Sequence, residues 1–77
     1  MKIVLLNSEE ITHEVLAEKF GFPPYYGKNL DALHDCLTDI AEKTIIILKK
    51  SKQIDSRILT VLRDSEEENP KLKIYEG

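Results

Sequence analysis

Three aspartates lie four residues apart in the middle of the chain: Asp31, Asp35 and Asp39. On a helix this spacing places the three carboxylates on one face, about 6 Å apart along the axis. Like charges at this spacing destabilise a helix by a few tenths of a kcal/mol per pair, and no Lys or Arg lies between them. Acidic runs are more often plain solvated surface, but this one also predicts a face that binds a cationic partner.

The same segment holds residue types that could do catalysis. His34, Asp35 and Cys36 are consecutive, so on a helix their side chains fan apart and cannot form a nucleophile and its base. Asp31 and His34 have the spacing of one metal-ligand pair, but a di-iron bundle needs such motifs on two helices. There is no zinc spacing, Walker pattern or Gly-rich phosphate loop. The sequence therefore predicts no enzymatic activity, no cofactor and no metal.

The acidic face requires a helix with an apolar opposite side. Asn29 is a good N-cap residue, and a helix is expected from there to about Ile40. Its core-facing stripe consists of residues at helical spacing: Leu30, Leu33, Leu37 and Ile40. Just before it, Pro23 and Pro24 exclude a helix, so the aromatic segment at residues 22–27 is expected to be a loop. Of the two adjacent tyrosines, Tyr25 is expected to be exposed and Tyr26 buried.

The chain before this loop predicts a strand and a helix. A strand is expected at Lys2 to Leu6, because residues 3–6 are apolar without alternation, which is typical of a strand covered on more than one side. Asn7, followed three residues later by Glu10, is a capping-box pattern that predicts the start of a helix. This helix is expected to end at Gly21.

The chain after the acidic segment predicts strand, helix and strand. The strands are expected at Thr44 to Leu48 and Lys71 to Tyr75, and the helix begins at Ser51 or Asp55 and ends at Asn69-Pro70. Strands separated by helices favour a parallel sheet with right-handed connections. Residues 1–77 are thus expected to form a single small α/β domain, with a three-stranded parallel sheet and three to four helices.

Composition narrows the function classes. The 77 residues carry 11 basic and 14 acidic side chains, a net charge of -3, which disfavours direct binding to nucleic acid or to an anionic membrane. Residues 7–42 alone have a net charge of -6, whereas the rest of the chain has +3. A single cysteine fits a reducing compartment, and no secretory leader is recognisable. A cytoplasmic protein is expected.

The stretch FPPYYGKNLDALHDCLT, residues 22–38, resembles the signature of the barstar family of intracellular ribonuclease inhibitors. The resemblance rests on the string Tyr-Tyr-Gly at 25–27, Asn-Leu-Asp-Ala-Leu at 29–33, and then Asp35 and Leu37-Thr38. The expected order of strands and helices extends it to the whole chain. It implies an inhibitor that forms a one-to-one complex with a basic, secreted-type, guanyl-specific ribonuclease of the barnase kind.

The resemblance also implies roles for single residues. Asp35 would occupy the phosphate-binding pocket of the nuclease, Asp31 would pair with a basic group at its rim, and Tyr25 would contact an active-site histidine. Asp64, on the last helix, aligns with a contributing acidic position, and His34 stands where family members commonly carry Trp. Further positions would line the contact: Gly27, Asn29, Leu30 and Thr38.

Two other function classes fit the residues. An immunity protein against a toxin, or a binder of another basic protein, would need the same acidic face. The acidic face indicates that the partner is basic, but it does not identify the partner. A purely structural domain would explain the leucine stripe but not the acidic residues opposite it.

Overall fold

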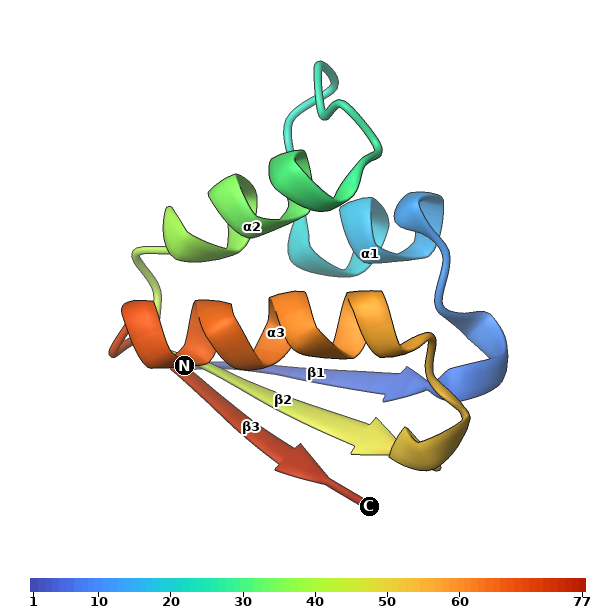
Figure 1. Cartoon of the computed structure of the whole chain (residues 1–77). Helices are drawn as coiled ribbons and strands as arrows, with labels where there is room; N and C mark the ends of the chain where they lie inside the picture. Colours follow the sequence, from blue (N-terminus) through green and yellow to red (C-terminus); the bar gives the residue numbers. More distant parts are fainter.

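In the computed structural model, which describes residues 1–77, one layer of helices covers one face of a three-stranded parallel sheet (Figure 1). The strands are β1 (Lys2–Asn7), β2 (Thr44–Lys49) and β3 (Leu72–Glu76), in the order β1-β2-β3. The helices are α1 (His13–Phe20), α2 (Leu30–Thr38) and α3 (Ser56–Glu68), with 3-10 turns at Ser8–Glu10 and Ser51–Gln53. The predicted α/β fold with a parallel sheet is confirmed.

The core lies between the sheet and this helical layer. Every second residue of the strands points into it, as the period of two requires, and apolar helix residues close it from the other side. Its most deeply buried side chains, each at most 1% exposed, are Leu6, Leu16, Leu33, Leu37, Ile46, Leu48 and Leu62. Leu33 and Leu37 belong to the predicted stripe of α2, which therefore faces the core as expected.

The opposite face of the sheet carries no helix (Figure 1). Ile3 and Leu5 of β1 are 57% and 50% exposed, so the expectation that this strand is covered on more than one side is wrong. The strands follow one another across the sheet in chain order, and right-handed connections in one direction place every helix on the same face. The absence of alternation in β1 therefore reflects apolar residues on an open face.

The first helix begins later than the capping-box pattern predicts. Asn7 accepts a hydrogen bond only from the backbone N–H of Glu9, at 3.3 Å, and caps a short 3-10 turn. The helix α1 starts at His13, where the hydroxyl of Thr12 accepts from the N–H of Val15 at 3.1 Å. Ile11 and Thr12 are extended between the two. The chain needs this turn because α1 must run back across the sheet from the end of β1.

The other boundaries follow from local caps. Asp55 caps α3 by accepting from the N–H of Arg57 at 2.8 Å, whereas Ser51 lies in the preceding 3-10 turn. Of the two predicted starts of this helix, Asp55 is therefore correct and Ser51 is not. The second helix ends at Thr38, slightly before the predicted Ile40, and Asp39 is its C-cap.

The ends of α2 and α3 are joined by one buried amide. Asn69, 5% exposed, donates from Nδ2 to the carbonyl oxygens of Leu37 and Ile40, each at 3.0 Å, and to that of Thr38 at 3.3 Å. Its Oδ1 accepts from the N–H of Lys71 at 2.9 Å. These carbonyls lie at the end of α2 or just beyond it, where no further helical turn supplies N–H donors. Only that of Leu37 also accepts a backbone hydrogen bond, from the N–H of Ile40 at 3.3 Å. Asn69 therefore fixes where α2 ends relative to α3.

We expect Asn69→Ala to lower the free energy of unfolding by about 2–3 kcal/mol, because three carbonyl oxygens at the end of α2 lose the amide donor that they share. Asn7→Ala is the matched control, since its side chain makes one hydrogen bond to the backbone, and we expect a loss of about 0.5 kcal/mol. Urea unfolding of both variants measures the difference. Equal stabilities of the two variants would show that Asn69 does not hold α2.

Candidate functional site

The exposed face of α2 carries unpaired negative charge. Asp31, Asp35 and Asp39 are all exposed, and none takes part in any of the six ion pairs of the structure. The nearby Arg57 is held by Asp55, 3.2 Å from carboxylate to guanidinium. The carboxylates of α2 are therefore free to bind an external cation.

The loop before α2 presents Tyr25 beside this face. Tyr26 is 7% exposed and anchors the loop: its hydroxyl is 2.6 Å from Nδ1 of His13, and its ring centroid is 4.9 Å from that of Phe22. Tyr25 is 87% exposed. The predicted division between a buried and an exposed tyrosine is confirmed.

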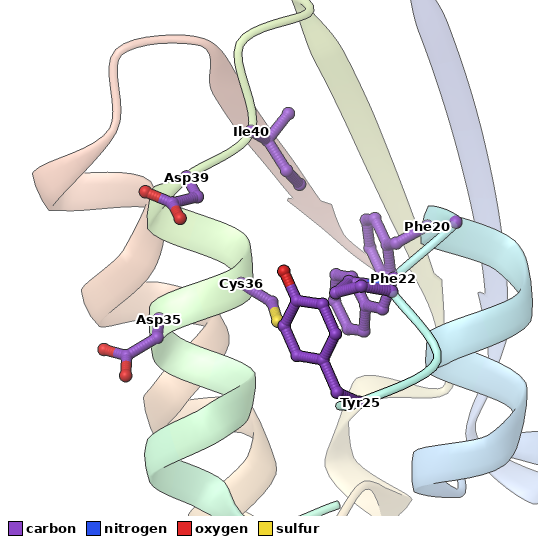
Figure 2. A pocket seen from close by; sticks show the side chains of 9 residues that line it. Phe20, Phe22, Tyr25, Asp35, Cys36, Asp39 and Ile40 are labelled. Atoms are coloured by element: carbon purple, nitrogen blue, oxygen red, sulfur yellow. The ribbon is translucent and has the colours of Figure 1, made fainter. Parts of the chain in front are cut away.

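A groove of about 480 Å³ separates this loop from α2. Figure 2 shows the ring of Tyr25 beside Cys36, while the carboxylates of Asp35 and Asp39 point away from that ring. Both aspartates are exposed. Burial raises the pKa of the Cys36 thiol, and the two aspartates raise it further. The thiol therefore stays protonated at neutral pH and is a poor nucleophile, as expected for a packed cysteine.

Two of the predicted contact residues use their side-chain donors within the chain. Asn29 caps α2 by accepting from the N–H of Ala32 at 2.8 Å, and its Nδ2 donates to the carbonyl of Gly27 at 3.3 Å. Thr38 donates its hydroxyl to the carbonyls of His34, at 2.9 Å, and Asp35. Both residues shape the surface. The Thr38 hydroxyl can still accept a hydrogen bond from a partner, and Asn29 keeps one free N–H on Nδ2.

The remaining predicted positions complete the rim. Gly27 is exposed, and a Cβ there would lie 3.3 Å from Nδ2 of Asn29, so a side chain would crowd the cap. Leu30 is half-buried and lines a shallow groove with Asp31 and Arg57. The surface at this end of α2 is therefore continuous with the start of α3.

Helix α3 extends the acidic surface. Asp64, Glu67 and Glu68 line a hollow together with His34, and Nε2 of His34 contacts the carboxylate of Glu68. The structure thus places Asp64 next to α2, whereas the sequence reading missed Glu67 and Glu68. Their spacing puts all three acids on one helix face, but the sequence does not say which face of α3 adjoins α2.

These features define a small α/β protein with an exposed acidic helix and an adjoining aromatic loop. Residues 3–74 match the model of the family described as Barstar (barnase inhibitor). A Bacillus subtilis (strain 168) protein named "Putative ribonuclease inhibitor YrdF" is 34% identical over 67 residues, which cover 77% of this chain and 74% of that protein.

The chain therefore belongs to the barstar family. Proteins of this family are inhibitors and not enzymes. This agrees with the position of His34, Asp35 and Cys36 at consecutive places on α2, where their side chains point in different directions. None of the helices has the length and apolar character needed to cross a membrane.

The anchor of the aromatic loop can be tested by alkaline titration. Burial, followed by the nearby Cys36 and Glu14, raises the pKa of Tyr26 from 10.0 to about 12. The folded state therefore favours the neutral phenol, and this contribution to stability is present below pH 10 and is lost as the pH rises toward 12. Tyr26→Phe has no phenol to ionise.

We expect wild type to lose more free energy of unfolding than Tyr26→Phe between pH 9 and 12, as measured by urea unfolding. At neutral pH the variant should be less stable by about 1 kcal/mol, because it lacks the hydrogen bond to His13. Parallel pH profiles of the two proteins would contradict the assigned anchor.

Proposed function

We propose that this protein inhibits a secreted-type, guanyl-specific ribonuclease of the barnase kind by forming a one-to-one complex with it in the cytoplasm. The acidic face of α2 and the loop at residues 22–28 enter the basic active site, where carboxylates take the place of RNA phosphates. The observation that carries the proposal is the set of three exposed, unpaired aspartates on α2. The family match supports a ribonuclease as the partner.

Asp35 is the central residue of this proposal. It lies midway along the acidic face and borders the grooves on the Tyr25 side of α2. A carboxylate in the phosphate pocket of a nuclease accepts charge-assisted hydrogen bonds from Arg and His side chains, which are stronger than neutral ones. Water is excluded most completely at the centre of an interface, so the energetic contribution of a charge is greatest there.

The surrounding residues act as a rim. Asp31 on one side, and Asp64 across the hollow at His34, surround the centre with negative charge. Such a field attracts a basic nuclease over a distance and speeds association. Tyr25 contributes aromatic contact area at low entropic cost, because its ring has only two rotatable bonds.

Inhibition of a barnase-type ribonuclease in an RNA-cleavage assay, with isothermal titration of the same pair, tests the proposal. We expect stoichiometric one-to-one inhibition and an affinity that weakens as salt rises, because salt screens the attraction between the acidic face and the basic nuclease. Absence of both inhibition and heat would exclude this class of target. A different basic partner or an imported toxin would then be sought.

Substitution of single aspartates tests the assigned centre. We expect Asp35→Ala to weaken nuclease binding by about 2 kcal/mol or more, roughly 30-fold in Kd. Asp39→Ala removes the same group from the end of the helix and should cost about 0.5 kcal/mol, as a rim charge does. Equal losses measured by titration would contradict the central role of Asp35.

Restoration of an aromatic residue tests position 34. His34→Trp enlarges the apolar contact area at the interface, and we expect tighter binding to a barnase-type nuclease, by about tenfold. His34→Gln keeps a polar side chain there and serves as the control for loss of the Glu68 contact. If the tryptophan variant bound with the affinity of wild type, position 34 would not tune partner choice.

A further inference from the structure

The outer face of the sheet is apolar and bare. The paired positions on this face form two rows across the strands, Ile3-Ile45-Lys73 and Leu5-Ile47-Tyr75. Ile3, Leu5 and Tyr75 are 50–57% exposed, and the two β2 isoleucines are half-buried. Parallel sheets are nearly always covered on both faces. Here all three helices lie on the other side (Figure 1).

The edges of the same sheet are protected. At the β1 edge, Lys19 donates from Nζ to the carbonyl of Leu5 at 2.8 Å. At the β3 edge, the carboxylate of Glu66 accepts from the N–H of Ile74 at 2.6 Å, and Arg63 binds Glu76 through two hydrogen bonds. Charged side chains on strand edges prevent pairing with another strand. What remains open to a partner is therefore the face.

The charge of this face is positive. Lys73 lies on the edge strand β3 at one end of the face, and Lys49, which follows Ile47 on the same side of the central strand β2, lies at the other end. Neither lysine is in an ion pair. The strand residues on this face include no acid, because Glu76 turns to Arg63 of α3. The face thus complements an occupant that is apolar in its middle and acidic at its flanks.

The dimensions of the face match one helix. Three strands about 4.8 Å apart, each about 20 Å long, offer a strip roughly one helix diameter wide and as long as about 13 helical residues. A second copy fits less well. Two such faces would bury roughly 600 Å² in total, about half of what a stable interface needs, and their lysines would add like charges.

We propose that the outer sheet face docks an amphipathic α-helix of a partner protein, with an apolar stripe flanked by Asp or Glu. The helix lies along the strands over Ile3, Ile45, Leu5 and Ile47, and its acidic flanks pair with Lys73 and Lys49. This face lies on the side of the sheet opposite the helical layer that carries α2. A nuclease and this helix can therefore bind together.

Amide NMR spectra of the 77-residue protein, titrated with a synthetic amphipathic helical peptide with Leu on one face and Glu on its flanks, test the proposal. We expect shifts confined to the three strands and weak binding, ~100 μM, because the face is small. The same peptide with Lys in place of Glu should bind about tenfold more weakly.

Two substitutions locate the contact. Tyr75→Ser removes the aromatic ring from the face and should weaken peptide binding about tenfold, whereas Tyr25→Ser, on the loop before α2, should leave it unchanged. The double variant Lys49→Glu, Lys73→Glu should reverse the preference between the two peptides. Far-ultraviolet circular dichroism of each variant establishes that it folds.

Several results would overturn the proposal. One is the absence of strand shifts at ~1 mM peptide, well above the weak affinity expected of so small a face. A second is peptide binding that is indifferent to flanking charge. Concentration-dependent dimerisation through this face would identify a second copy as the occupant, and binding to phosphatidylserine vesicles without peptide binding would identify a lipid surface.

Discussion

The burial of two leucines decides what α2 presents to solvent. Leu33 and Leu37 are fully buried between the helix and the rest of the core, which fixes the rotation of α2 about its own axis. Because a helix places residues on defined faces, this burial forces Asp31, Asp35 and Asp39 outward together. The acidic face is thus a consequence of core packing, and Asn69 holds its far end in place.

The three aspartates on one face lower the stability of α2. Asp39 lies at the carboxyl end of α2, where the helix dipole disfavours a negative charge. Lysines that could neutralise such acids form ion pairs with other residues instead. Lys28 pairs with Glu14, and Lys50 pairs with Glu9. A fold optimised for stability alone would mix signs along α2. Local departures of this kind are expected where a surface has been shaped for binding.

The sequence predicted what local rules control. The cap at Asn29, the stripe of α2 and the division between Tyr25 and Tyr26 depend on residues close in the chain, and the structure confirms them. The predicted start of α1 was wrong because Asn7 and Thr12, five positions apart, can both act as N-caps, and only the turn after β1 selects Thr12.

Features that depend on contacts between elements were not predictable in this way. The open face of the sheet follows from the order of strands and the hand of the connections, which β1 alone does not encode. The bonds of Asn69 to α2 and the approach of Glu67 and Glu68 to His34 join residues about thirty positions apart. A single sequence does not show which residues of two distant helices lie against each other.

The central claim is that α2 occupies the phosphate site of a ribonuclease. Its most direct test is competition between this protein and a non-cleavable guanosine nucleotide for a barnase-type enzyme, followed by fluorescence of a labelled nucleotide. If the claim holds, the protein displaces the nucleotide completely, and saturating nucleotide lowers the apparent affinity of the protein in proportion. A ternary complex, in which nucleotide and protein bind the nuclease together, would contradict the claim.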